Sequence, residues 1–397
     1  MNRRCHVFSS ALQLLRTLKE AGHEAFLVGG CVRDLLLGKS PQDYDIATRA
    51  LPAQVQACFA KVIPTGIKHG TVTVLLGGHS FEVTTYRSEG EYMDGRRPSQ
   101  VHFHASIEED LSRRDFTINA MAYNPLEDCW VDVWGGREDL THHLIRCVGN
   151  PLQRFSEDGL RAIRAVRFAS TLNFKLDIAT QEAIGQRLEL FSKVSVERIR
   201  EEFLKLLASA HAQRGLTLLL DTGLLKCFLP EAAMADFAMA TRPQGLWPRL
   251  ALLLSHAATA QPRAVLQRLK LPNKVVETVV HLINAPPLPP VDAGEVDLRR
   301  WLSQVREEHW EDALAVGEAL GAREESLHER MTALLSQTPA LSVDKLALRG
   351  DDIGLILGIP PGPRIGEASR FLLEKVLENP SLNSREALSQ LLRTWNK

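Results

Sequence analysis

The hydrophobic pattern of the chain changes near residue 155, and this change limits the folds that the chain can adopt. Before it, short β-rich runs end near glycines or turns, as in HEAFLVGG (23–30), YDIAT (44–48) and CWVDVWGG (129–136). Two alternating runs, GTVTVLL (70–76) and FEVTTYR (81–87), flank the turn GGHS and predict a hairpin. The first part of the chain therefore predicts a small sheet accompanied by a few helices.

After this point apolar residues recur at helical spacing, with little strand signal. The runs that carry this periodicity are ATQEAIGQRLELF (179–191), SVERIREEFLKLLAS (195–209), QRGLTLLLDTGLL (213–225) and WPRLALLLSHAATA (247–260). Ser195 is the expected N-cap of its helix. The proline-rich stretch NAPPLPPVDAGE (284–295) is the best candidate for an internal linker. The pattern predicts an α+β fold, in which a mixed-sheet head precedes an all-helical remainder.

The composition narrows the function classes without selecting one. The 47 Lys and Arg residues nearly balance the 48 Asp and Glu residues, so a nucleic-acid site must be a local basic surface. No run of about 18 apolar residues is present, which argues against a membrane partner. The six cysteines are scattered without a Cys-x-x-Cys pair, so we expect a reducing compartment and a cytoplasmic protein.

One predicted helix, SEDGLRAIRAVRFAS (156–170), carries arginine at every third position. Because a helix turns every 3.6 residues, the row Asp158, Arg161, Arg164 and Arg167 winds about 180° around its axis. At least one of these guanidinium groups must then meet apolar surface or a partner other than water. A solvated surface helix would not need this arrangement.

The segment VGGCVRDLLLGKSPQDYDIAT (28–48) carries the strongest chemical signal. Two glycines end a strand and allow the backbone to approach a ligand, and the helix that follows presents free amides with Arg33 one turn in. This combination suits a triphosphate. Asp43 and Asp45 lie two apart on a strand-like segment, so we expect both to point to the same side and to hold one or two Mg²⁺ ions.

The pattern Gly29-Gly30-x-x-Arg33-Asp34 followed by Asp43-x-Asp45 resembles the catalytic motif of the polymerase-β-like nucleotidyltransferases. Within them the chain is similar to the bacterial class II tRNA nucleotidyltransferases and poly(A) polymerases. Further matches follow in the family's order: HGTV (69–72), EVTTYR (82–87), YMDGRRP (92–98), RRDFTINAMA (113–122), EDGLRAIRAVRF (157–168), SVERIREE (195–202) and GDDIGLILGIPPGPRIG (350–366).

The resemblance implies an order of domains along the chain. A nucleotidyltransferase catalytic head is expected over residues 1–150, and a helical neck with a base-recognition helix over 151–208. A helical body over 209–290 and a tRNA-binding helical tail over 291–397 would complete an elongated molecule. The tail would contact the acceptor arm of tRNA mainly through its phosphates.

The resemblance also assigns residues to the nucleotide. Asp158 and Arg161 act as a protein template for the incoming base, because a carboxylate accepts from the amino group that cytosine and adenine share. The Arg161 guanidinium donates to the neighbouring ring nitrogen. Uracil and guanine carry a keto oxygen in place of the amino group, so an acceptor of the base would face the acceptor of Asp158. The wider nucleotide-binding set that the resemblance implies for ATP and CTP is Gly30, Arg33, Arg114, Asp158, Arg161, Arg164 and Arg167. A structural role for the arginines, neutralised by acids such as Glu157, stays open.

The same resemblance bears on two further segments of the sequence. Residues 86–101 correspond to the family's flexible loop for the terminal A step, and the loop is complete here, which argues against an enzyme that adds only C. Its matching residues are Tyr92, Asp94, Arg96, Arg97 and Pro98. Glu82 lies on the predicted strand FEVTTYR, where it is either a third carboxylate near the metals or an ordinary strand residue.

The implied activity is template-independent addition of C and A to the 3′ end of tRNA, with CTP and ATP as substrates and pyrophosphate as product. Addition of the terminal A alone and polymerisation of A on other RNAs use the same pocket, so the motifs do not separate them. An inactive RNA-binding relative is the alternative from another class. The intact carboxylates and arginines of the motifs argue against it.

Overall fold

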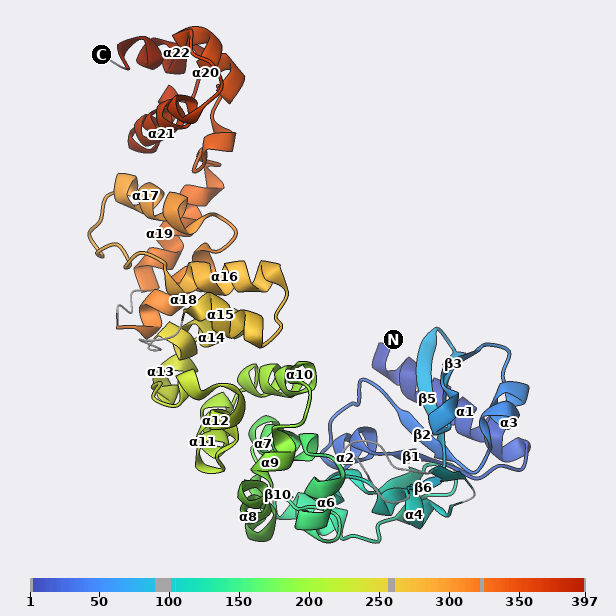
Figure 1. Ribbon diagram of the computed structural model, residues 1–397. Helices are drawn as coiled ribbons and strands as arrows, with labels where there is room; N and C mark the ends of the chain where they lie inside the picture. Colours follow the sequence, from blue (N-terminus) through green and yellow to red (C-terminus); the bar gives the residue numbers. More distant parts are fainter. Residues whose placement is uncertain (1–2, 90–100, 104, 256–260, 322–324, 396–397) are drawn as a thin grey trace. The chain divides into compact units, whose positions relative to one another are not determined.

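The computed structural model describes residues 3–89, 101–103, 105–255, 261–321 and 325–395 (Figure 1). The predicted loop residues 92–98 lie outside the described residues. By its internal contacts the chain forms two compact units, Met1–Pro230 and Glu231–Lys397. Within the parts of the chain that the structure describes, no helix combines the length and apolarity needed to span a bilayer.

A seven-stranded sheet forms the centre of the first unit. Its strands are β1 (Ala25–Val28), β2 (Asp45–Thr48), β3 (Val62–Gly66), β4 (Thr71–Leu76), β5 (His79–Thr85), β8 (Ala122–Asn124) and β9 (Cys129–Val131). They run in the order β3-β4-β5-β2-β1-β8-β9. The pairing of β2 with β5 is parallel and the other pairings are antiparallel, so the mixed sheet is confirmed.

The predicted hairpin is confirmed as β4 and β5. Its two-residue connection is Gly77-Gly78, with φ of 60° and 80°. Positive φ at both central residues gives a turn whose twist matches that of the flanking strands, which explains two glycines here. The remaining strands are the short pairs β6 (Arg87–Glu89) with β7 (Val101–Phe103) and β10 (Leu144–Ile145) with β11 (Lys175–Leu176).

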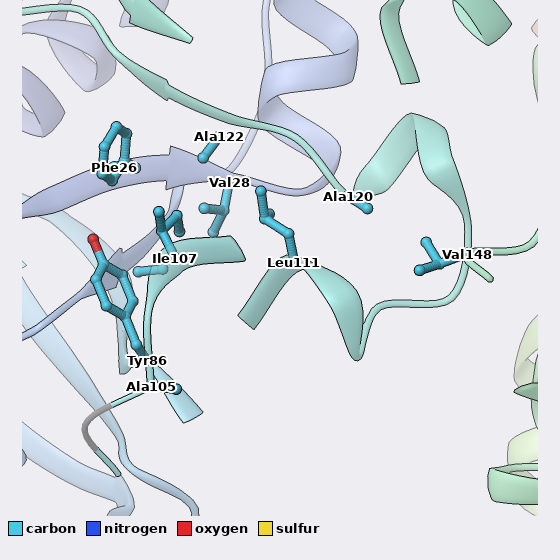
Figure 2. Packing of buried hydrophobic residues seen from close by; sticks show 10 residues of the cluster. Phe26, Val28, Tyr86, Ala105, Ile107, Leu111, Ala120, Ala122 and Val148 are labelled. Carbon is cyan, nitrogen blue, oxygen red and sulfur yellow. The ribbon is translucent and has the colours of Figure 1, made fainter. Parts of the chain in front are cut away.

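One face of the sheet packs on the segment that follows β7. Phe26 and Val28 of β1 meet Ile107 and Leu111 of α4 (Ile107–Ser112), and Tyr86 lies beside them (Figure 2). All five residues are buried. Burying apolar side chains of this size contributes roughly 1.5–3 kcal/mol each relative to exposure. This core fixes the end of β1, from which the chain enters its glycine turn.

The first unit contains eleven further α-helices among its described residues. They are α1 (Arg3–Glu20), α2 (Gly30–Leu36), α3 (Pro52–Cys58), α5 (Gly136–Thr141), α6 (Pro151–Glu157), α7 (Leu160–Leu172), α8 (Ile178–Gln186), α9 (Leu188–Phe191), α10 (Val196–Leu207), α11 (Ala212–Asp221) and α12 (Leu224–Phe228). Helix α7 packs against α10 and α11. Ser195 occupies the N-cap position of α10 with extended backbone angles, but its hydroxyl makes no capping bond.

The predicted single helix over 156–170 is wrong at its start. Helix α6 ends at Glu157, Asp158 is extended with φ of −149°, and α7 begins at Leu160. At Gly159 a Cβ atom would lie 2.7 Å from the Leu190 carbonyl oxygen, so only glycine allows this close passage of two backbones. The break sets Asp158 apart from the helix, with its carboxylate accepting from the Leu160 amide at 3.0 Å.

The second unit is helical throughout its described residues. Its helices are α13 (Phe237–Ala240), α14 (Leu246–Ser255), α15 (Pro262–Arg268), α16 (Asn273–Ile283), α17 (Glu295–Val305), α18 (Trp310–Ala319), α19 (Glu325–Ser336), α20 (Gly350–Leu357), α21 (Pro363–Glu378) and α22 (Arg385–Thr394). The proline-rich stretch joins α16 to α17 inside this unit, and the Trp301 indole donates to the Pro286 carbonyl at 3.3 Å. The expected four-part division at 150, 208 and 290 stays a prediction.

Candidate active site

A cavity of about 550 Å³ lies in the first unit, beside the end of β1 and the first turns of α7. Eight of the nine predicted site residues line it: Gly30, Arg33, Asp45, Arg114, Asp158, Arg161, Arg164 and Arg167. The other lining residues are Gly29, Arg113, Asp115, Asn119, Leu160, Phe168 and Arg198. The ninth predicted residue, Asp43, is exposed in the bend before β2 and does not line the cavity.

A group of negative charges marks one edge of this cavity. Asp45 opens β2 and pairs with Val28 in register, and the parallel neighbour β5 brings Glu82 alongside. Burial of the Asp45 carboxylate raises its pKa, and the charges of Glu82 and Asp43 raise it further against the opposing effect of Arg114. Asp45 is exposed toward the cavity, yet enough protein surrounds it to remove part of its hydration.

The carboxylates of Asp43 and Asp45 fit a divalent cation by their chemistry. Both are hard oxygen donors, and the charge of Asp43 is among the causes that raise the pKa of Asp45, an effect that a nearby cation would oppose. Among the described residues, no group of three or more His, Cys, Asp or Glu side chains has the geometry of a complete metal site. The protein would therefore supply part of a coordination shell, with substrate and water oxygens completing it.

Gly29 brings the backbone unusually close to two charged side chains. Its φ is +75°, and a Cβ there would lie 2.9 Å from Arg114 Nη1 and 3.7 Å from Asp45 Oδ2. Arg114 donates to Asp110 at 3.3 Å, but its Nε is buried with no hydrogen-bond partner in the described part of the chain. A buried donor without a partner costs on the order of 1–3 kcal/mol, so the Arg114 Nε–H group is suited to donate a hydrogen bond to an anionic ligand.

Arg33 projects from the first turn of α2 into the same cavity. It donates to Asp34 at 2.9 Å and to Asn119 at 2.8 Å. Its guanidinium carbon also lies 5.3 Å from the centre of the Phe168 ring. Arg33 is thus held from two sides, as a phosphate-binding arginine at a helix start requires.

The arginine row of α7 is neutralised one residue at a time. Arg164 donates to Asp115 from Nε at 2.9 Å and from Nη2 at 2.7 Å, and Arg167 donates to Glu202 at 2.7 Å. Burial would raise the pKa of Asp115, but the Arg164 guanidinium outweighs it and holds that pKa at about 2. The spacing of three thus lets the arginines reach acids on different elements. Arg161 meets Glu157 of α6. Arg164 meets Asp115, and Glu202 of α10 binds Arg167 and also lies 3.7 Å from Arg164.

Asp158 and Arg161 both line the cavity, but they do not pair with each other. Arg161 donates to Glu157 at 2.5 Å and to two backbone carbonyls. The Asp158 carboxylate instead binds Arg198 of α10, at 2.7 and 3.4 Å. Sequence reasoning missed Arg198 as a site residue, although it lies within the recognised motif SVERIREE.

Three models of known protein families match successive parts of the chain. Residues 25–146 match the model of the poly(A) polymerase head domain. Residues 173–235 match “Probable RNA and SrmB-binding site of polymerase A”, and residues 241–392 match tRNA nucleotidyltransferase domain 2. Along the chain, the three matches cover in turn the seven-stranded sheet, helices α8 to α12, and the helical second unit.

Whole-chain relatives extend the match to full length. The chain is 39% identical to the CCA-adding enzyme of Geobacillus stearothermophilus over 98% of each chain, and 40% identical to that of Lactobacillus helveticus over 97% of each. It superposes with a TM-score of 0.85 on the crystal structure of the Bacillus stearothermophilus CCA-adding enzyme in complex with CTP. The two are 35% identical, and 99% of this chain and 98% of that one are covered. The chain therefore belongs to the family of CCA-adding enzymes, the tRNA nucleotidyltransferases that share the poly(A) polymerase head.

Proposed function

We propose that this chain completes and repairs the 3′ CCA end of tRNA, adding C and A from CTP and ATP with release of pyrophosphate. The observation that supports the proposal is one cavity of about 550 Å³ that Asp45, the turn Gly29-Gly30, Arg33, Asp158 and Arg161 all line. The full-length relatives named CCA-adding enzymes support the substrate assignment. The helical second unit would contact tRNA phosphates, and a cytoplasmic location stays a prediction.

Asp43 and Asp45 are the residues that would hold Mg²⁺, which when bound supplies positive charge at the reacting phosphate and lowers the pKa of the primer hydroxyl. The carboxylates themselves fix where that charge sits relative to the glycine turn. Asp45 is anchored by its register with Val28, whereas Asp43 lies outside the sheet. Chemistry at the α-phosphate therefore takes place at the end of β1.

The triphosphate is bound by groups that the fold places around Gly29. The helix start at Gly30 offers backbone amides, Arg33 reaches in from α2, and Arg114 offers its unpaired Nε. With the triphosphate held there, the 3′-hydroxyl of tRNA attacks the α-phosphorus in line. The bond to the bridging oxygen breaks, and pyrophosphate leaves with that oxygen.

Base selection falls to Asp158 and Arg161. Asp158 accepts from the amino group of cytosine or adenine, and Arg161 donates to the ring nitrogen beside it. Uracil and guanine present a keto oxygen to the carboxylate, which leaves two buried acceptors facing each other. That mismatch costs on the order of 1–3 kcal/mol per unpaired group, so C and A are chosen without a nucleic-acid template.

The activity is tested with tRNAs that end before CCA, after C and after CC, each offered labelled CTP or ATP separately. We expect C on the first two and A on the third, because one pocket serves both bases. An unstructured RNA serves as the control and should gain little A. Incorporation of A alone, on the CC end alone, would replace full CCA addition by A addition, and efficient tailing of the control RNA would indicate a poly(A) polymerase.

A further inference from the structure

Asp158 and Arg161 carry opposite charges and line the same cavity, with Asp158 in the extended break before α7. Here each has a different partner. Asp158 binds Arg198, and Arg161 binds Glu157. All four side chains are largely shielded from solvent, with exposed fractions between 11% and 27%, so their interactions are stronger than those of surface pairs.

The bonds already made leave a specific capacity unused. A carboxylate offers about four lone-pair positions. Asp158 uses three of them, for the Leu160 amide and for two contacts from Arg198. Of the five N–H donors of Arg161, three are used, for Glu157 and for the carbonyls of Arg154 and Arg113. Among the residues that the structure describes, these bonds leave one acceptor of Asp158 and two donors of Arg161, which is the complement of the cytosine edge and also accommodates adenine.

We propose that Arg198 is a specificity-determining positioning residue that keeps Asp158 away from Arg161 and so preserves the base-reading edge. The proposal rests on the base-reading role given to Asp158 and Arg161 above. Without Arg198, the Asp158 carboxylate would be free to pair with another guanidinium that lines the cavity, that of Arg161 or Arg164, and would lose the capacity that reads the base. Glu157 plays the reciprocal role for Arg161.

The test compares R198A, R198K and the matched control R200A, which removes the same side chain from another face of α10. The readout is the ratio of kcat/KM for CTP to that for UTP on one tRNA. R198A should lower this ratio about tenfold or more, because an Asp158 carboxylate that pairs elsewhere no longer disfavours the keto oxygen of uracil. R198K should retain part of it, since lysine supplies the charge without the two-pronged contact. R200A should leave the ratio unchanged.

A general loss of stability would lower both efficiencies together and leave the ratio intact, so it cannot imitate the expected result. If R198A and R198K keep the wild-type ratio while D158A changes it, Arg198 has no part in selection and the base-reading role survives. If D158A also keeps the ratio, the base-reading role itself is wrong. Binding of tRNA should be equal in all these variants.

A second inference comes from the Phe168 ring, which also lines the cavity and is 6% exposed. Three guanidinium carbons lie near its centre: Arg33 at 5.3 Å, Arg164 at 5.4 Å and Arg167 at 3.6 Å. A cation attracted to an aromatic face gains about 0.5–2 kcal/mol. We infer that Phe168 is a positioning residue that holds Arg33 for the triphosphate, on a ring that Arg164 and Arg167 also contact.

Replacing Phe168 by Leu keeps an apolar side chain and removes the aromatic face. The KM for CTP and for ATP should rise by a similar factor, about three- to tenfold, with an unchanged CTP:UTP ratio, and F168Y should restore the wild-type KM. F116L is the matched control, because Phe116 packs edge-on against Phe168 in the core. Equal KM values for F168L and the wild type, or the same rise in F116L, would refute this role.

Discussion

Replacement of Asp45 by alanine should reduce nucleotide transfer by at least about 10³-fold. It removes one of the two carboxylates that would hold Mg²⁺ beside the reacting phosphate. The loss should appear in single-turnover transfer of labelled CTP to a tRNA that lacks CCA. Binding of that tRNA should remain near the wild-type level, because Asp45 lies in the nucleotide cavity.

Glu82→Gln is the matched control for this prediction. It makes a comparable charge change on the neighbouring strand, but removes a carboxylate outside the proposed pair. We expect less than about tenfold loss of transfer, because the carboxylates of Asp43 and Asp45 both stay in place and Glu82 acts on Asp45 only through its charge. Transfer retained in D45A would remove the metal assignment. Loss in E82Q as complete as in D45A would make Glu82 part of the site.

Replacement of Asp158 should change which base is accepted. D158A removes the acceptor that rejects a keto oxygen, so the CTP:UTP ratio of kcat/KM should fall about 10- to 100-fold, as expected from 1–3 kcal/mol of lost mismatch penalty. D158N should favour UTP further, because its amide can donate to the keto oxygen while its own oxygen still accepts from Arg198. Both ratios come from initial rates on the same tRNA.

The control for the base-reading prediction is affinity for tRNA, which both Asp158 variants should keep. Arg161 provides a second check, because R161A removes the donors but leaves the acceptor, and should weaken CTP and ATP alike. An unchanged CTP:UTP ratio in D158A and D158N would show that selection comes from elsewhere in the cavity.

The parts of the site that sequence predicted correctly depend on short stretches of chain. Gly29 and Gly30 follow a strand by two residues at most, so their role could be inferred from the pattern of β1 and α2 alone. The hairpin was equally accessible, because its turn consists of two glycines between alternating runs. The cavity gathers eight predicted residues because the recognised motifs lie at the ends of adjacent elements.

The parts that sequence missed depend on contacts between distant stretches. The break at Asp158–Gly159 arises from the backbone at Leu190, which no local pattern near residue 158 could indicate. The partner of Asp158 was also not predictable, because a periodic row of charged residues does not indicate which acidic side chain pairs with which arginine. Arg198 lies on α10, three helices after α7 in the chain, and only the packing of α7 on α10 reveals its pairing.

In the proposed function, the side chains of Asp158 and Arg161 read the incoming base in place of a nucleic-acid template. A crystal structure of this chain with CTP and Mg²⁺ tests it most directly. We expect the cytosine amino group within hydrogen-bond distance of the Asp158 carboxylate, the N3 and O2 atoms facing Arg161, and Arg198 still bound to Asp158. A cytosine turned away from Asp158 and Arg161, or an Asp158 carboxylate paired with Arg161 in the loaded enzyme, would contradict it.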